Sequence, residues 1–425
     1  MKIQIKKIAE VLEGELLSSE EAAKRFCTSC SWDSREMKTG AAFFAMPGER
    51  VNGARFVESS FKDGCELAIV QVDAPADELL KAKQAAKAID KALLIVADVQ
   101  ASAQKLAHYW AGEIDAKIIG ITGSVGKTST KNFVRRVLSE KYKVTATKGN
   151  QNNEIGMPMT VLSADINTEI LITEMGMYHR GEIAELCSIA HPNIALITCV
   201  EDCHLETCGS RENVAKAKSE IFEGLGAGDL AILRKDCNFH DLVLEHSGVL
   251  ISGAKLIDID DKNYVKNVKL DEFQRPSFDF DFEGQGNFKH CQLKIPGSHN
   301  VKNAIFAGVV ASQLGMSNAE IKQGLNKCEA EPGRMQILEN KDNELTVIND
   351  AYNANPQSMR QGIAAFEEIK FPGQKIAVLG SMMELGPDEI EIHREIGDIL
   401  NACESISKYV FVGELAKHFT DNFSN

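Results

Sequence analysis

The sequence lacks long apolar runs. None of its 425 residues lies in an uninterrupted hydrophobic stretch approaching the ~20 residues of a transmembrane helix. Residues 1–10 alternate lysine with isoleucine instead of building the apolar centre of a secretory signal. We therefore expect a cytoplasmic protein with no stable membrane insertion, and we expect it to act as a monomer.

The sequence also lacks an excess of positive charge. Its 47 lysine and arginine residues are outnumbered by 61 aspartate and glutamate residues, which gives a formal net charge of −14. This balance disfavours polyanionic partners, so we expect neither nucleic acid nor an anionic membrane surface to be bound. Any phosphate site in this chain must be positive only locally.

A second metal-binding cysteine pair is missing as well. The 11 cysteines include the pair Cys27-x-x-Cys30 and the group Cys199, Cys203 and Cys208, but no second C-x-x-C completes a tetrahedral zinc set. Cysteines that are odd in number and scattered through a large cytosolic chain indicate reduced thiols. We expect no structural zinc and no disulfide framework.

What the sequence does contain is a strand, a phosphate loop and a helix in succession. The apolar run at 117–122 suits a buried parallel strand, and apolar residues after the loop recur at helical spacing. The loop has the short G-x-x-G-K-T form, because the strict G-x-x-x-x-G-K-[ST] pattern would need a glycine at Ile121. Backbone N–H groups of such a loop surround phosphate oxygens, Lys127 can reach the outer phosphates, and Thr128 can place a hydroxyl on Mg²⁺.

Alternating helices and buried strands follow from about residue 99, which is typical of a doubly wound parallel sheet. At about 150 residues per domain, the length predicts about three domains. Residues 1–98 carry short strands between helices without a phosphate loop, and another α/β unit starts after the Glu331-Pro332-Gly333 linker. We predict an α/β protein with a small domain at 1–98, a central phosphate-loop domain at 99–330, and a Rossmann-like domain at 331–425.

Several polar residues have two interpretations each. Glu174 directly follows a strand and is either solvated or an oxygen ligand of Mg²⁺, and His204 is either structural or a ligand. Lys218 lies on the apolar stripe of a predicted helix, where it either snorkels or is held neutral for chemistry. Asn300 either caps a helix or reaches a purine. Asp33-Ser34-Arg35 forms either a solvated turn or a pyrophosphate contact.

Taken together, these motifs resemble the ATP-dependent Mur ligases of peptidoglycan synthesis. The resemblance extends from Asp33 to Gly386 and includes, in the family's order, the segments Thr122–Thr128, Lys148–Pro158, Glu174–Gly176, His204–Glu206, Ala215–Phe222, His299–Asn300 and Asp350–Pro356. The last segment is most similar to the branch that joins D-alanyl-D-alanine to UDP-N-acetylmuramoyl-tripeptide.

The resemblance implies an amide ligase. ATP would phosphorylate the terminal carboxylate of the tripeptide, and the dipeptide amine would attack the acyl phosphate. The implied cofactors are ATP, two Mg²⁺ ions, and CO₂ carried as a carbamate on Lys218. The resemblance assigns catalysis to Lys127, His204 and Lys218; metal binding to Thr128, Glu174, His204 and Lys218; ATP contacts to Gly123, Ser124, Gly126, Lys127, Thr128, Ser129, Asn300, Arg334 and Asp350; and substrate contacts to Ser34, Arg35, Asn152, Asn353 and Asn355.

The sequence departs from the family pattern at four places. Ser381 stands for the usual aspartate, Glu201-Asp202-Cys203 for Gly-Pro-Ala, and Asn52-Gly53-Ala54 for Asp-Gly-His. The family's further strand and Lys-Gly-Ser stretch do not follow His418, so we expect the third domain to be short at its end. Three alternatives stay open: a Mur-type or folylpolyglutamate-type ligase with another amine substrate, a nucleotide-binding relative without ligase activity, and a phosphate-loop kinase.

Overall fold

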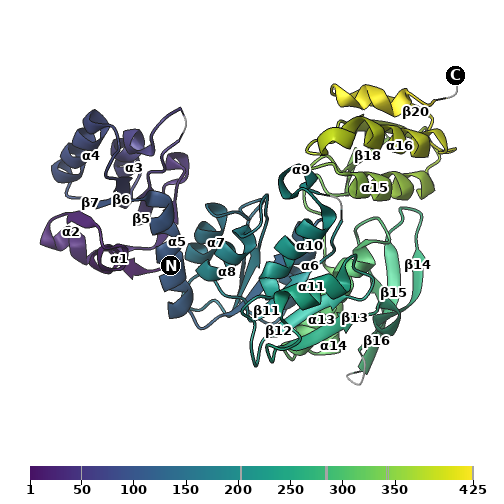
Figure 1. Ribbon diagram of the computed structural model, residues 1–425, viewed down its shortest axis with the longest axis horizontal. Coiled ribbons are helices and arrows are strands. Elements are labelled where there is room, and N and C mark those ends of the chain that lie inside the picture. Colours follow the sequence, from purple (N-terminus) through teal and green to yellow (C-terminus); the bar gives the residue numbers. More distant parts are fainter. Residues whose placement is uncertain (49, 202, 283–285, 341, 343, 424–425) are drawn as a thin grey trace. The chain divides into compact units, whose positions relative to one another are not determined.

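The computed structural model shows two compact units (Figure 1). It describes residues 1–48, 50–201, 203–282, 286–340, 342 and 344–423. The first unit comprises Met1–Gly120, Lys143–Met175 and Ala184–Pro192, and the second comprises Ile121–Tyr142, Gly176–Ile183 and Asn193–Asn425. Among the helices of the described residues, none is both long and apolar enough to span a bilayer.

The first unit contains a five-stranded sheet with the order β2-β7-β6-β5-β4. Its strands are β2 Glu15–Leu17, β4 Ser29–Ser31, β5 Ala41–Phe44, β6 Cys65–Gln71 and β7 Ala92–Val96. Only β2 runs antiparallel to its neighbour. All residues of β5 and β7 are buried, as expected of parallel strands covered on both faces. The apolar runs at 41–45, 67–71 and 93–97 predict strands, and the structure confirms them within two residues.

Helices cover this sheet on both sides. In Figure 1, α3 and α4 lie on one side and α1 on the other. The helices and short strands of the amino-terminal segment are β1 Ile3–Gln4, α1 Ile5–Leu12, α2 Glu20–Lys24, β3 Phe26–Cys27, α3 Val57–Lys62, α4 Ala76–Ala88 and α5 Val99–Glu113. Phe43, Val57 and Leu93 are among the buried residues that join β5, α3 and β7 into one core.

A six-stranded sheet has the order β13-β12-β11-β8-β10-β9. Its strands are β8 Lys117–Thr122, β9 Val144–Ala146, β10 Ile170–Glu174, β11 Ile194–Ile197, β12 Leu230–Arg234 and β13 Lys255–Ile259. The pairs β9–β10, β11–β12 and β12–β13 are parallel. The strand order reverses at β8, so the carboxyl end of β8 is the switch point at which open α/β sheets bind ligands. The predicted strand at 117–122 is confirmed without an end shift.

The helix after the phosphate loop is packed by two later helices of the second unit. These are α6 Lys127–Leu138, α13 Asn300–Gln313 and α14 Asn318–Asn326, and α6 packs against both others. A Cβ atom on Gly324 of α14 would lie 2.6 Å from the Cα atom of Val137, so glycine permits this close approach. The other helices around the sheet are α7 Gly156–Ser163, α8 Glu182–Ile189, α9 Leu205–Cys208, α10 Arg211–Ser219, α11 His240–Ser247 and α12 Asp261–Tyr264.

An antiparallel sheet follows in the sequence. It consists of β14 Val265–Leu270, β15 Pro276–Phe282 and β16 Gly286–Gln292. The alternation at 278–282 predicts a hairpin-like strand, and the structure confirms a strand there with Phe278 and Phe280 buried. This sheet carries none of the predicted site residues.

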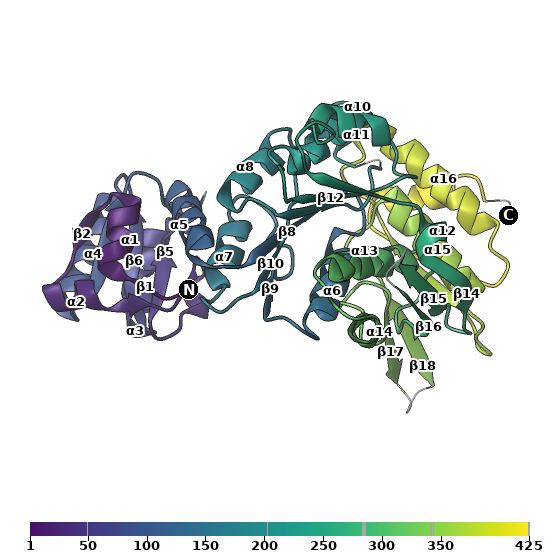
Figure 2. The same cartoon turned by 90° about the horizontal axis from the view of Figure 1, so that it is seen from below.

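The carboxy-terminal part of the second unit has two small sheets. β17 Gln336–Asn340 and β18 Leu345–Asn349 form an antiparallel hairpin (Figure 2). β19 Ile376–Gly380 pairs in parallel with β20 Lys408–Val412, and the helices of this part are α15 Pro356–Glu368 and α16 Glu389–Asn401. The sequence predicts strands at 345–349, 375–379 and 409–412, and the structure confirms them within one residue at each end.

Candidate active site

The phosphate loop connects β8 to α6 through two glycines with positive φ, +147° at Gly123 and +83° at Gly126. A Cβ atom at Gly123 would lie 2.0 Å from the Thr198 hydroxyl, so only glycine fits there. Thr198 donates its hydroxyl to the carbonyl of Val125 at 2.6 Å. The Lys127 ammonium donates to the carbonyl of Gly123 at 2.7 Å. The phosphate loop is therefore held against the segment after β11, and the Lys127 ammonium is folded back onto a carbonyl of the loop itself.

The segment after β11 makes further contacts with this loop. The Ser124 hydroxyl donates to the carbonyl of Glu201 at 3.0 Å and accepts from the Glu201 N–H at 2.8 Å. The Cys203 thiol lies 3.1 Å from the same hydroxyl, while Asp202 lies outside the described residues. The three residues that depart from the family pattern thus include two that support the phosphate loop. Neither Thr198, which directly follows β11, nor Glu201, which lies four residues beyond the end of β11, was predicted as a support.

A buried chain of hydrogen bonds links the phosphate-loop helix to α13. The Thr130 hydroxyl contacts Asn303 Oδ1 at 2.9 Å, and Asn303 Nδ2 donates to Asn300 Oδ1 at 2.9 Å. Asn300 Nδ2 then donates to the carbonyl of Pro296 at 2.7 Å. Because each amide has one acceptor and one donor side, this chain fixes the orientation of the Asn300 amide. Asn303 was not among the predicted residues, although its spacing of three from Asn300 places both on one helix face.

Lys218 is buried, as its place on the apolar stripe predicts. Helix α10 begins after the N-cap Ser210, and Lys218 is 1% exposed. Burial lowers the pKa of the Lys218 amine, and the nearby Lys127 charge lowers it further. The interpretation of Lys218 as a snorkelling residue is therefore wrong. Glu220 lies four residues after Lys216, a spacing that predicts an ion pair on the solvent side of a helix, but it is buried and accepts the Gly181 N–H at 2.8 Å.

His204 lies close to the same charges. Burial lowers the pKa of His204 to about 4, and the charges of Lys218 and Lys127 act in the same direction, so the imidazole is neutral at pH 7. Its Nδ1 atom lies 3.5 Å from Glu384 Oε2. The ring of Tyr178 approaches His204 edge-on, with the ring centroids 5.1 Å apart. A neutral imidazole fits the role of metal ligand.

The donor set restricts how a metal could be held. Within the described ranges, no group of three or more His, Cys, Asp or Glu side chains could hold a metal ion. Mg²⁺ prefers oxygen ligands, of which the Thr128 hydroxyl is one. The amine of Lys218 cannot serve as an oxygen ligand, whereas a carbamate on it could. The residues therefore fit magnesium only together with phosphate oxygens, water or that carbamate.

One pocket of the second unit brings together residues of the phosphate loop and of the segment after residue 333. Gly126, Ser129, Asn300, Arg334 and Asp350 are among the residues that line it. The phosphate-loop, α13 and carboxy-terminal motifs, far apart in the sequence, thus meet in one pocket.

Arg334 is the link between these motifs. Its guanidinium donates to the Thr128 hydroxyl at 3.2 Å and stacks over the ring of Tyr352 at 4.2 Å. Asp350 accepts the Met335 N–H at 3.0 Å. The protein around the Asp350 carboxyl raises its pKa to about 6, whereas Met335 N–H and Arg334 lower it.

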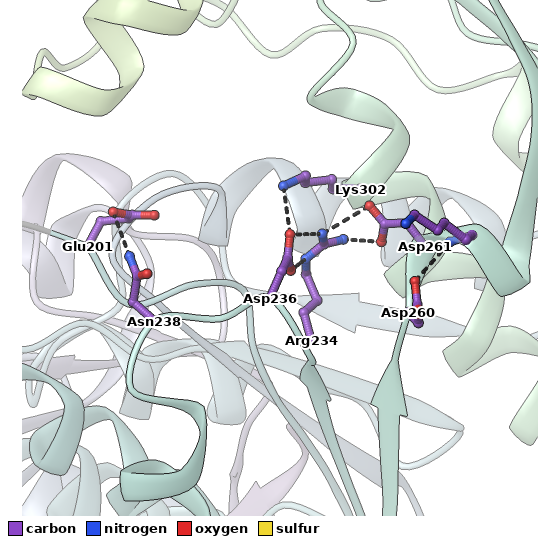
Figure 3. A network of polar contacts seen from close by, with 8 residues as sticks. Glu201, Arg234, Asp236, Asn238, Asp260, Asp261 and Lys302 are labelled. Carbon is purple, nitrogen blue, oxygen red and sulfur yellow. Dashed lines mark hydrogen bonds and ion pairs between the residues drawn. The ribbon is translucent and has the colours of Figure 1, made fainter.

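An ion network centred on the buried Arg234 contributes Arg234, Asp236 and Lys302 to the lining of the same pocket (Figure 3). Arg234 is 4% exposed and binds the carboxylates of Asp236 and Asp261. Lys302 lies 3.4 Å from Asp236. Arg234 is thus neutralised by two carboxylates and is held in place by them. No motif within residues 230–295 indicates this network or any other chemistry.

Four predicted residues lie in the first unit. Glu174 is buried at the end of β10, and its Oε1 accepts from Asn152 Nδ2 at 2.9 Å. Arg35 has an 86% exposed side chain that pairs with Asp33 at 2.6 Å, next to Ser34 in a short 3-10 helix. The structure thus brings Asn152 and Glu174 together and shows Ser34 and Arg35 on a surface turn.

The two asparagines expected near the dipeptide serve local structure. Asn355 caps α15, with its Oδ1 accepting the Ser358 N–H at 2.8 Å. Asn353 Oδ1 accepts the N–H of Ala354 at 3.0 Å. Substrate contacts of Asn353 and Asn355 stay a prediction.

Comparison with known proteins identifies the family. Three family models match: "Mur ligase family, catalytic domain" at residues 27–111, "Mur ligase middle domain" at 121–311, and "Mur ligase, glutamate ligase domain" at 333–423. They agree with the predicted three-domain α/β architecture, while the predicted domain boundaries stay a prediction.

Relatives and solved structures agree with these matches. The UDP-N-acetylmuramoyl-tripeptide–D-alanyl-D-alanine ligase of Bacillus subtilis is 32% identical over 98% of this chain and 86% of its own length. The enzyme of that name from Escherichia coli is 29% identical over 99% of this chain and 90% of its own length.

Two crystal structures cover nearly the same length. MurF from Acinetobacter baumannii is 27% identical with a TM-score of 0.84 and covers 99% of this chain and 88% of its own. MurF from Thermotoga maritima in complex with ADP is 26% identical with a TM-score of 0.72 and covers 91% and 88%. The chain belongs to the Mur ligase family and is similar to its MurF members.

Proposed function

We propose that this protein joins D-alanyl-D-alanine to UDP-N-acetylmuramoyl-tripeptide at the expense of ATP, as the names of its relatives describe for them. The observation that carries the proposal is the pocket in which Gly126 and Ser129 of the phosphate loop meet Asn300, Arg334 and Asp350. The phosphate loop alone would fit any nucleotide-binding protein, and Asn300 and Arg334 add an amide and a cationic group to the same pocket.

The chain's own residues contribute positioning and charge neutralisation around a transferring phosphoryl group. Lys127 stands at the first position of α6, where the helix N-terminus also favours phosphate. Arg334 brings a second positive charge to the Thr128 hydroxyl. When bound, Mg²⁺ would neutralise further charge on the phosphate oxygens.

The proposed reaction has two steps. A carboxylate oxygen of the tripeptide bonds to the γ-phosphorus while the bond from that phosphorus to the bridging oxygen breaks, which releases ADP. The dipeptide amine then bonds to the acyl carbon, the carbon–oxygen bond to phosphate breaks, and the amine gives up a proton. Lys127 and Arg334 hold the phosphoryl group in line for the first step.

The described side chains supply too few oxygen ligands for two Mg²⁺ ions, so phosphate oxygens, water or a carbamate on Lys218 must complete the sets. We assign Thr128 and Glu174 to the ion at the ATP phosphates, and His204 and Lys218 to the second. The assignment of Glu174, which lies in the first unit, rests on the family pattern. Burial lowers the pKa of the Lys218 amine, which favours the neutral form that can add CO₂, losing one proton to give a carbamate whose oxygens suit Mg²⁺.

The remaining assignments concern the ends of the substrate. Ser34 and Arg35 would hold the UDP moiety, which requires Arg35 to exchange Asp33 for a pyrophosphate. Asn152 would keep Glu174 oriented, and Asn353 and Asn355 would lie near the dipeptide. We place the reaction in the cytoplasm and propose that the enzyme acts as a monomer.

The direct test is product mass. The protein is incubated with ATP, Mg²⁺, UDP-N-acetylmuramoyl-tripeptide and D-alanyl-D-alanine, and the product is identified by mass spectrometry. We expect the pentapeptide, which has the mass of both substrates minus one water, with one phosphate released per product.

A panel of amines separates the alternatives. A product formed with single amino acids but not with the dipeptide would indicate another Mur-type or folylpolyglutamate-type ligase. A product that keeps the phosphate would indicate a kinase. ATP binding without substrate-dependent phosphate release would indicate a relative without ligase activity. Each of these results would contradict the proposal.

A further inference from the structure

The pocket lined by the phosphate loop extends to the end of β12. In the sheet, β12 is separated from β8 only by β11, and Thr198 directly after β11 contacts the phosphate loop. Neighbouring strands lie about 4.8 Å apart, so the carboxyl end of β12 is roughly 10 Å from that of β8. Asp236, the second residue after β12, lines the same pocket as Gly126. A nucleotide with its phosphates on the phosphate loop reaches this distance with its sugar or its base.

Asp236 is a fixed carboxylate that stays open to solvent. The Arg234 guanidinium donates to both carboxylate oxygens of Asp236, at 2.8 and 2.7 Å, and Lys302 Nζ lies 3.4 Å from Oδ2 (Figure 3). The Asp236 side chain is nevertheless 58% exposed. An ionised carboxylate has about four lone-pair sites, so Asp236 can accept further hydrogen bonds from a ligand. The hydrogen bonds from Arg234 hold the pKa of Asp236 below its usual value, so this acceptor is charged at pH 7.

The charges of this network sum to zero. Arg234 also binds Asp261, so the two cations Arg234 and Lys302 are matched by the two carboxylates of Asp236 and Asp261. A neutral group of side chains does not attract a phosphate in the way that a positive site does. The network therefore suits an uncharged part of the nucleotide.

The hydrogen-bonding groups favour the sugar over the base at this network. A carboxylate only accepts hydrogen bonds, and the two neighbouring hydroxyls of a ribose can each donate one. In dinucleotide-binding folds a single acidic residue holds the ribose 2′-hydroxyl in this way. The base is better matched by other residues of the pocket, which include the apolar side chains of Ile295 and Phe306 and the amide of Asn300.

We propose that Asp236 is a specificity-determining residue that accepts hydrogen bonds from the ribose hydroxyls, so that the protein selects ribonucleotides over deoxyribonucleotides. Arg234, which is buried, is the positioning residue that fixes the Asp236 carboxylate. This inference rests on the proposed function, because it takes the pocket to bind ATP, and it names the part of ATP that is recognised. No assignment given above includes Asp236.

The competing interpretation is a purely structural network that ties the end of β12 to two helices. Asp261 belongs to α12 and Lys302 to α13. A structural role of Asp236 predicts that its substitution weakens every nucleotide equally. A ribose contact predicts a loss only for the nucleotide that carries the hydroxyl. A double-mutant cycle, in which the missing hydroxyl is the second change, separates the two interpretations.

Isothermal titration calorimetry of the full chain with ADP, 2′-deoxy-ADP and 3′-deoxy-ADP measures this cycle without turnover. The wild type should bind at least one deoxy analogue about 10–100-fold more weakly than ADP, as expected for a hydrogen bond to a charged group. Asp236→Ala should bind ADP as weakly as it binds that analogue, while its affinity for the analogue stays at the wild-type level. Asp236→Asn should keep part of the difference, because the amide oxygen still accepts a hydrogen bond.

Asp241→Ala is the matched control, at a 93% exposed aspartate of α11 outside the pocket, and it should bind all three nucleotides like the wild type. Circular dichroism and thermal melting confirm that each variant is folded. If Asp236→Ala does not fold, Asp236→Asn decides, and a wild-type ratio of ADP to deoxy-ADP affinity in that variant would overturn the inference.

The inference is also overturned if the wild type binds ADP and both deoxy analogues equally, if Asp236→Ala weakens all three to the same extent, or if Asp241→Ala loses the discrimination as well. The proposed function is judged separately from pentapeptide formation by the wild type. Pentapeptide formation without discrimination between the sugars would overturn only this inference. Discrimination without pentapeptide formation would overturn only the proposed function.

Discussion

The central residues 121–313 and the carboxy-terminal residues 333–423 differ in how deeply their polar side chains are buried. In the central part, Thr130, Lys218 and Asn300 are at most 3% exposed. In the carboxy-terminal part, Tyr352 is 47% exposed and Glu384 has a 57% exposed side chain. Preorganised charges act more strongly than charges that must first be brought into place. We infer that the central part sets the chemistry and that the carboxy-terminal part adjusts it.

The strands of the central part are also more deeply buried than those of the carboxy-terminal part. Strand β12 is buried along its whole length. Strand β19 instead alternates, with Ala377 8% exposed and Val378 66% exposed. Parallel strands covered on both faces gain hydrophobic stabilisation from every residue, whereas those covered on one face gain it from every second residue. The central part is therefore expected to dominate stability as well as chemistry.

The largest expected effect is that of Lys218→Ala. It removes the amine that would carry the carbamate, so ligase activity should be abolished while the fold stays intact. Acetate or formate should partly restore activity by placing a carboxylate in the vacated volume. Lys216→Ala, on the same helix but half-buried, is the control and should be nearly silent. Full activity of Lys218→Ala, or equal damage by Lys216→Ala, would remove the carbamate from the mechanism.

Lys127→Ala should have the next largest effect. It removes a positive charge facing the transferring phosphate, which costs about 2.7–4 kcal/mol of transition-state stabilisation, or about 10²–10³ in kcat. Steady-state kinetics at saturating ATP measure this loss. A loss of less than tenfold would contradict the assignment of the phosphate loop.

Arg334→Lys tests the carboxy-terminal contribution. The ammonium keeps the charge but cannot combine the contact to Thr128 with stacking on Tyr352. A hydrogen bond of a charged group contributes about 1.5–3 kcal/mol, so kcat/KM for ATP should fall about 10–100-fold. This loss should be smaller than that of Lys127→Ala. If the loss caused by Arg334→Lys were larger than that caused by Lys127→Ala, the carboxy-terminal part would contribute more to catalysis than the central part, contrary to the account.

The smallest expected effect concerns the exposed sheet face. Val378→Thr should change the free energy of unfolding by less than about 0.5 kcal/mol, as is usual for exposed positions. Ile232→Ala, in the buried strand β12, should destabilise the protein by about 2–5 kcal/mol. Urea denaturation measures both. Equal losses would show that the face of β19 is covered in solution.

Local patterns predicted the elements and the local site features well. The strand, phosphate loop and helix at 117–138 follow from an apolar run, glycines and helical spacing, and the structure shows them. The place of Lys218 on the apolar face of α10 follows from helical periodicity, which left open whether its amine reaches water. These features are set by neighbours in the sequence, which a single sequence displays.

Contacts between distant residues could not be predicted. The hydrogen bond between Thr130 and Asn303 joins residues 173 positions apart, and that between Arg334 and Thr128 joins residues 206 positions apart. The burial of Glu220 depends on the Gly181 N–H, which no helical pattern reveals. Asn355 caps α15 because its backbone is extended and its side chain accepts the Ser358 N–H. Such partners are fixed by tertiary packing rather than by local propensity.

The most direct test of the account is the fate of the carboxylate oxygen. UDP-N-acetylmuramoyl-tripeptide is prepared with ¹⁸O in both oxygens of its terminal carboxylate and is converted with ATP and D-alanyl-D-alanine. The account predicts that each released phosphate carries one ¹⁸O atom and that the new amide keeps the other, because the carboxylate attacks the γ-phosphorus. Release of unlabelled phosphate together with amide formation would contradict an acyl phosphate and with it the role assigned to this pocket.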